Sequence, residues 1–252
     1  MTEPVFDHEK LDVYRLSIEY GTAQGLKGAN RHIRDQWLRA AQSIPLNIAE
    51  GNGKQNLKDK NHYFQIARGS ALECAAVHDI LTACDVIDPA VNRNGKSRLK
   101  RIVSMLTRLI QRSDRVAPDA IEYEYSTEVI MTEPVFDHEK LDVYRLSIQY
   151  VADSYGTAKG LKDTNRHIRD QWLRAAQSIP LNIAGGNGKQ NLKDKNHYFQ
   201  IARGSALECA AVHDILTACD VIDPAVNRNG PQRTVSDQSL WRPSGNGCQS
   251  GG

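Results

Sequence analysis

Basic side chains gather on one face of the segment that closes the first half of the chain. Four arginines fall within a stripe about 60° wide when plotted at about 100° per residue: Arg101, Arg108, Arg112 and Arg115. A guanidinium group is a planar fork of donors that matches a phosphate, so the stripe predicts a face for nucleic acid or an acidic partner. The wider set of candidate nucleic-acid-binding cations is Lys96, Arg98, Lys100, Arg31, Arg34, Lys54, Lys58 and Lys60. The alternatives are a solvated helix face and arginines that complement a helix dipole.

Two acids, Glu50 and Glu73, stand among apolar and small residues. A pair of catalytic carboxylates is one interpretation. The favoured one is that each carboxylate pairs with Arg39 or Arg68 at an end of the fold. The second half of the chain has Gly185 where the first has Glu50. If Glu50 pairs with an arginine, restoring glutamate at 185 is expected to stabilise the second half.

The other polar motifs do not have the spacing that chemistry requires. The GNGK segment at 51–54 lacks the spacing of a phosphate-binding loop and is interpreted as a turn. The histidines form neither the HExxH nor the Glu-x-x-His pattern of metal sites. Cys74 and Cys84, repeated as Cys209 and Cys219, are interpreted as small hydrophobes on a buried helix face. We therefore predict no enzymatic activity, cofactor, metal or small-molecule substrate.

Amphipathic helices must position these side chains. Apolar residues at steps of three and four predict helices over 8–20, 30–50, 57–86 and 96–115, with Pro45 expected to kink the second. The heptad seam of the third runs through Tyr63, Ala67, Ser70, Cys74, Val77, Leu81 and Cys84. The apolar stripe of the fourth consists of Leu99, Ile102, Leu106 and Leu109. This pattern predicts an all-α fold, an up-down antiparallel four-helix bundle.

A direct repeat governs the domain organisation. Residues 1–95 align with 131–230 at 90 of 95 positions, with one gap at 151–155, VADSY. We predict four parts: a bundle with a shortened first helix over 1–117, an acidic linker over 118–130, a truncated three-helix repeat over 131–229, and a disordered tail over 230–252. The three helices of the second repeat lack a fourth partner. The first repeat, another chain or nothing could cover them.

The composition is that of an ordinary globular protein. The 252 residues include 32 Lys and Arg against 30 Asp and Glu, a net charge of +2, which is modest for a dedicated nucleic-acid binder. No window is apolar enough to span a membrane, and the N-terminus has no secretory signal. The five cysteines are an odd number, which argues against a disulfide framework. A cytoplasmic protein with no membrane partner is expected.

Two segments carry a family resemblance: QWLRAAQSIPLNIAEGNGK at 36–54 and YFQIARGSALECAAVHDI at 63–80. They resemble the bacterial four-helix-bundle proteins encoded in intervening sequences of 23S rRNA genes, to which the accessory variability proteins of diversity-generating retroelements are similar. The matching motif residues are Ser43, Asn47, Glu50, Gly51, Gly69, Ser70 and Glu73. The resemblance implies a four-helix bundle, a homo-oligomer (a homopentamer in relatives), an association with RNA or a nucleic-acid-handling protein, and no enzymatic activity. The chain departs from the pattern at the VADSY gap, at Gly185 and in the missing fourth helix of the second repeat.

The sequence thus predicts a non-enzymatic, oligomeric bundle that associates with RNA or nucleoprotein through arginine-rich helix faces. One alternative is an assembly scaffold with no nucleic-acid role. The other is a degenerate duplication with no selected function, which the unequal damage to the two repeats favours.

Overall fold

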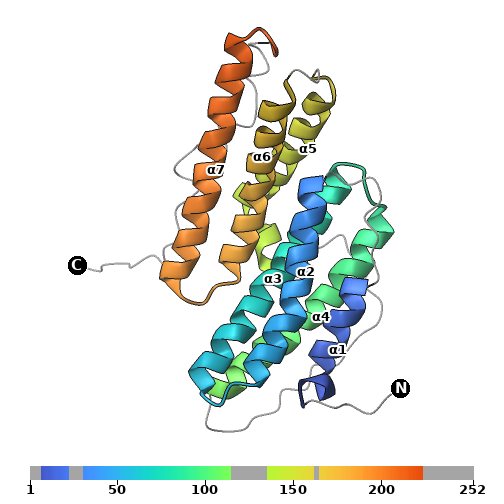
Figure 1. The fold of residues 1–252 in the computed structure, drawn as a ribbon, viewed down its shortest axis with the longest axis vertical. Helices are drawn as coiled ribbons and strands as arrows, with labels where there is room; N and C mark the ends of the chain where they lie inside the picture. The colour runs from blue at the N-terminus through green and yellow to red at the C-terminus, as the bar shows by residue number, and fades with distance from the viewer. Residues whose placement is uncertain (1–6, 23–30, 115–134, 162–164, 224–252) are drawn as a thin grey trace, which may run out of the picture.

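The described residues fold into α-helices (Figure 1). This computed structural model describes residues 7–22, 31–114, 135–161 and 165–223. Within those ranges it contains seven α-helices, two 3₁₀ turns and no strand, which confirms the all-α prediction. None of the helices in these ranges is long and apolar enough to cross a membrane. The predicted linker at 118–130 and tail at 230–252 lie outside the described residues.

The first repeat is a four-helix bundle. A 3₁₀ turn, η1 (Asp7–Lys10), precedes α1, and α2 packs between α1 and α3 while α4 packs against α3 and α1. The bounds of the helices are α1 Asp12–Thr22, α2 Arg31–Asn52, α3 Leu57–Ala83 and α4 Pro89–Asp114. The predicted heptad seam of α3 is buried at Ala67, Cys74 and Val77, as close helix packing requires. Ile110, rather than the predicted Leu109, completes the buried stripe of α4.

Local chemistry explains where the helices begin and end. The side chain of Asn56 caps α3 by accepting from the Lys58 amide at 2.9 Å. After α3, Asp85 adopts a left-handed backbone with φ 55°. Pro89 then begins α4, with Asp88 accepting from the Ala90 amide at 2.6 Å. The predicted start at 96 is therefore wrong, because a proline that ends one helix can occupy the first turn of the next. Helix α2 continues through Pro45.

The second repeat supplies three helices after a second 3₁₀ turn, η2 (Asp137–Lys140). They are α5 Asp142–Lys159, α6 Arg166–Asn187 and α7 Leu192–Ala218. Residues 151–155, which the first repeat lacks, lie within α5. Cys219 is exposed at the end of α7, so the prediction of a buried cysteine face is wrong at that position.

Helix α3 of the first repeat also packs against the second repeat. It lies along α6 and contacts α5, so the first repeat covers one side of the three helices (Figure 1). Helix α7 packs on α6, and its residues His197, Tyr198 and Ile201 line a cavity together with α2 of the first repeat. Of the three partners that the sequence left open, the first repeat is therefore the one that covers α5 and α6.

Candidate functional site: a charged joint and a basic face

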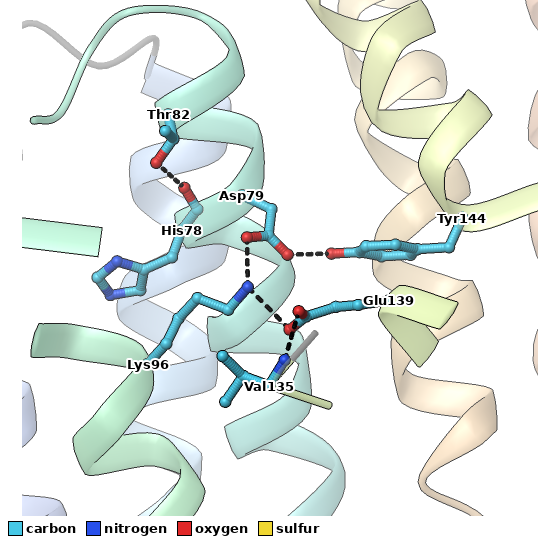
Figure 2. A network of polar contacts seen from close by, with 7 residues as sticks. All are labelled: His78, Asp79, Thr82, Lys96, Val135, Glu139 and Tyr144. Carbon is cyan, nitrogen blue, oxygen red and sulfur yellow. Dashed lines mark hydrogen bonds and ion pairs between the residues drawn. The ribbon is translucent and has the colours of Figure 1, made fainter. Parts of the chain in front are cut away.

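A buried charge network joins the two repeats (Figure 2). The Nζ atom of Lys96 on α4 lies 2.6 Å from Oδ1 of Asp79 on α3 and 2.8 Å from Oε1 of Glu139 on η2. Tyr144 on α5 donates its hydroxyl to Oδ2 of Asp79 at 2.8 Å. The Val135 amide donates to Oε2 of Glu139 at 2.9 Å. Two of the charges thus come from the first repeat and the third from the second.

A glycine allows the network to form. A Cβ atom at Gly95 would lie 2.2 Å from Cε1 of the His78 ring, so only glycine lets α4 cross α3 this closely. The crossing places the next residue, Lys96, beside Asp79. The similarity between the repeats ends at Gly230, the counterpart of Gly95, and Pro231 follows it. The second repeat therefore has no counterpart of Lys96 in this position.

Burial sets the electrostatics of the joint. It raises the pKa of the Glu139 carboxyl, and the Lys96 ammonium opposes that rise. The neighbouring His138 is fully buried, stacked on Phe136 with ring centroids 5.6 Å apart, and burial lowers its pKa to about 3. Neither ring nitrogen of His138 has a hydrogen-bond partner among the described residues. The joint therefore holds a neutral histidine beside an ion pair.

The same cluster offers metal-ligand atoms. One ligand atom each from Asp79, His138 and Glu139 lies within 4.8 Å of the others. No spacing motif could have revealed this set, because Asp79 lies on α3 and the other two on η2 of the second repeat. The Lys96 ammonium already lies between the two carboxylates, so a cation would have to displace it. As it stands, the cluster is a closed ion-pair network that fastens one repeat to the other.

The outer face of α4 presents cations to solvent. Lys100, Arg101 and Arg108 are exposed, and Arg98 is half-buried. None of these four has an ion-pair partner among the described residues. Helix α4 itself has no acid before Asp114. Some exposed cations elsewhere are paired along their own helices, for example Arg15 with Asp12 at 2.7 Å. The predicted Arg112 side chain and Arg115 lie outside the described residues.

Lys96 is not part of this outer face. The Lys96 side chain is 8% exposed and turned into the joint, which corrects its prediction as a nucleic-acid-binding residue. The helical wheel alone could not show this, because the partners of Lys96 lie on α3 and in the second repeat.

The remaining predicted cations divide between the two ends of the first bundle. The connectivity places Lys54, Lys58 and Lys60 at the end towards which α4 runs, and Arg31 and Arg34 at the opposite end. Lys58 and Arg34 are exposed, and Arg31 pairs with Asp35 at 3.6 Å. Lys60 lies 6.0 Å from the Phe64 ring centroid, and Lys54 lies 5.0 Å from that of Tyr63. The structure therefore does not gather all the predicted cations into one surface.

Several motif residues have a packing role. Ser70 on α3 donates to Ser43 Oγ on α2 at 2.8 Å. Within α2, the side-chain amide of Asn47 donates to the backbone carbonyl of Ser43 at 2.7 Å. Ser205, Ser178 and Asn182 repeat these bonds in the second repeat. A Cβ atom at Gly51 would lie 3.0 Å from the Phe64 ring, so this glycine permits close packing of the two helices.

The two motif acids differ in environment. Glu50 pairs with Lys54 at 2.5 Å, just beyond the end of α2, so the predicted arginine partner is wrong. Glu73 accepts from the side-chain Nε2 of Gln36 at 2.5 Å, and Arg39 donates to the side-chain Oε1 of the same Gln36 at 2.6 Å. Arg39 therefore reaches Glu73 through a glutamine. Burial raises the pKa of Glu73.

Replacing Gly185 with glutamate is expected to destabilise the second repeat, contrary to the expectation based on an arginine partner. Gly185 is buried, and a Cβ atom there would lie 3.2 Å from the Tyr198 ring. We expect Gly185→Glu to lower the free energy of unfolding by about 1–3 kcal/mol, measured by urea denaturation. The matched control is Gly156→Glu, since a Cβ atom at Gly156 meets nothing within 4 Å. Equal stability of the two variants would contradict this prediction.

One family model matches each of the two repeats separately. A family model described as 23S rRNA-intervening sequence protein matches residues 9–108 and again residues 139–234. The chain belongs to this family. The two matches agree with a tandem duplicated copy of one family domain. No curated protein and no solved structure matches the chain significantly. The predicted relation to the retroelement accessory proteins stays a prediction.

Proposed function

We propose that this family member is a non-enzymatic, oligomeric, cytoplasmic bundle protein that associates with RNA or nucleoprotein through the outer face of α4. The observation that supports the proposal is the row of unpaired cations on that face: Arg98, Lys100, Arg101 and Arg108. Membership of a family named for 23S rRNA intervening sequences agrees with an RNA-associated role.

The physical argument is one of charge compensation. Phosphates that contact these side chains would replace water without breaking existing ion pairs, because the described part of α4 supplies none to them. Contacts of this kind position the backbone of a nucleic acid and carry no base specificity. Binding should therefore tolerate many sequences and weaken as salt increases.

The test neutralises the three exposed cations together, as Lys100→Gln, Arg101→Gln and Arg108→Gln. We expect the variant to bind a fluorescent mixed-sequence single-stranded RNA at least about tenfold more weakly. The slope of log affinity against log salt should become shallower by about 2, because each of the three lost phosphate contacts contributes about 0.7. The readout is fluorescence anisotropy at several salt concentrations.

The matched control replaces two exposed arginines that are already paired, as Arg15→Gln with Arg145→Gln. Their partners Asp12 and Asp142 lie at 2.7 and 2.5 Å. This control should bind RNA as the wild type does. Unchanged binding by the α4 variant would show that RNA binds elsewhere, and a wild type that binds no RNA would contradict the proposal.

A second candidate function is an assembly scaffold with no nucleic-acid role, and it too rests on an observation. Helix α7 leaves Leu207 and Ile215 exposed, although their counterparts Leu72 and Ile80 on α3 are buried. Apolar side chains that one copy of this helix buries and the other exposes are available to a protein partner. Light scattering before and after nuclease treatment distinguishes the two functions, because a scaffold keeps its mass when nucleic acid is digested.

A further inference from the structure

A large cleft lies where the two repeats meet. Its volume is about 1040 Å³, and its lining comes from α2 and α3 of the first repeat and from α6 and α7 of the second. Sites for organic ligands have volumes of about 300–1,000 Å³, so the cleft is large enough for such a ligand. One repeat alone does not form it, because its lining needs helices from both.

Two arginines of the cleft are not neutralised by an acid. Arg39 on α2 and Arg174 on α6 occupy the same position in the two repeats, and both side chains are exposed. Arg39 donates to Oε1 of Gln36 at 2.6 Å, and Nε of Arg174 donates to the backbone carbonyl of Asp170 at 3.3 Å. Neither has an ion-pair partner among the described residues. A guanidinium group has five N–H donors, so each arginine keeps donors for a ligand.

The two acids of the cleft are already engaged. Asp35 lies 3.6 Å from Arg31, which does not line the cleft. Glu73 accepts from Nε2 of Gln36. Burial raises the pKa of the Glu73 carboxyl and so disfavours its charged form, although Arg39 opposes that rise. The positive charge of the two arginines is therefore not balanced within the cleft, which favours an anionic ligand.

The rest of the lining fits an organic body better than a bare inorganic ion. Leu38, Leu181 and Ile201 contribute apolar side chains from three different helices. Leu38 and Ile201 are each 39% exposed, so they are available to a ligand. Gln42 is exposed in the same cleft, and its carboxamide offers both a donor and an acceptor. A flat ring with polar edges, such as a nucleobase, matches this combination of apolar and amide groups.

We propose that this cleft binds a nucleoside 5′-monophosphate, with Arg39 and Arg174 donating to its phosphate group. A phosphate monoester carries a charge of about −1.5 to −2 at pH 7, which matches two guanidinium groups, whereas a carboxylate matches only one. The base lies against Leu38 and Ile201 and pairs with Gln42. The ligand is either a free nucleotide or the 5′-phosphate end of an RNA, which present the same chemistry. The site shares no residue with the outer face of α4 and goes beyond the RNA contacts proposed there.

The test titrates the purified full-length protein with AMP in a calorimeter. We expect Arg39→Gln and Arg174→Gln each to weaken AMP binding at least about tenfold, the usual effect of losing a charge-assisted hydrogen bond. Adenosine, which has the base but no phosphate, should bind at least about tenfold more weakly than AMP. The matched control is Arg34→Gln, an exposed arginine of α2 outside the cleft, which should bind AMP as the wild type does.

The two sources of the phosphate are distinguished by competition. An RNA with a 5′-phosphate that displaces AMP, while the same RNA with a 5′-hydroxyl does not, identifies an RNA end as the ligand. If neither RNA displaces AMP, the ligand is a free nucleotide. The α4 variant with Lys100, Arg101 and Arg108 neutralised should bind AMP as the wild type does, so this proposal and the proposed function can fail separately.

Three results would overturn the proposal. The first is a wild type that gives no binding heat at millimolar AMP. The second is adenosine binding as tightly as AMP, because the phosphate would then not be recognised. The third is AMP binding by both arginine variants with the affinity of the Arg34→Gln control. Circular dichroism should show all the variants folded, since each substituted arginine is exposed.

Discussion

Replacing Lys96 with methionine is expected to lower the free energy of unfolding by about 3–5 kcal/mol and to loosen the joint between the repeats. The substitution leaves Asp79 and Glu139 facing each other without the ammonium that lies 2.6 and 2.8 Å from them. Removing one partner of a buried ion pair costs more than the pair contributes, because the remaining charges stay desolvated. Urea denaturation followed by tryptophan fluorescence measures the loss, since Trp37 and Trp172 report on one repeat each.

Two further variants separate this mechanism from a general loss of packing. Lys100→Met makes the same change on the exposed side of α4 and should alter stability by no more than about 0.5 kcal/mol. Adding Glu139→Gln to Lys96→Met should recover part of the loss, because it removes one of the two facing carboxylates. If the double variant were no more stable than Lys96→Met, charge repulsion would not be the cause.

The bundle itself could be predicted because local patterns and tertiary packing agree in it. The heptad seam of α3 identified Ala67, Cys74 and Val77 as core residues, and all three are buried. The partner of Glu50 could also have been predicted, since Lys54 follows it by four residues, a spacing at which a glutamate and a lysine commonly pair. The start of α4 was missed because Asp88-Pro89 fits both the end of one helix and the beginning of the next.

The joint could not be predicted from sequence patterns. Lys96 pairs with side chains 17 and 43 positions away, on another helix and in the other repeat, and no helical periodicity connects them. The identical helices α3 and α7 make the same point, because one sequence has two patterns of burial. Which face is covered depends on the neighbouring helix, and this information is absent from the 27 residues themselves.

Mild acid is expected to destabilise the protein through its buried histidines. Burial lowers the pKa of His78 to about 4 and of His138 to about 3, and it also lowers the pKa of His213. A depressed pKa means that the unfolded chain binds protons first, so stability is full above pH 6.5 and falls towards pH 4. Each histidine lowers the free energy of unfolding by up to about 1.4 kcal/mol for each pH unit of acidification in that window.

His78 belongs to a buried chain of polar contacts. The Trp37 indole donates to the Tyr20 hydroxyl at 3.0 Å, and that hydroxyl lies 3.0 Å from Nε2 of His78. Burial disfavours the charged imidazolium there, and the Lys96 ammonium adds to the effect. Trp172, Tyr150 and His213 repeat the arrangement in the second repeat. Glu139 and Glu73 act in the opposite sense, since burial raises their pKa and their protonation favours the folded state.

The contribution of one histidine can be isolated with His138→Phe. This side chain has no hydrogen-bond partner among the described residues, and it stacks on Phe136, so phenylalanine preserves its apolar contacts. At pH 7.5 the variant should match the wild type within about 1 kcal/mol. Below pH 6.5 it should become more stable than the wild type by about 1.4 kcal/mol for each pH unit.

The control His62→Phe, at an exposed position of α3, should follow the wild-type curve. Parallel curves for His138→Phe and the wild type would show that His138 titrates alike in the folded and unfolded chains. Because His138 adjoins Glu139 in η2, the acid-induced loss should appear first as separation of the repeats.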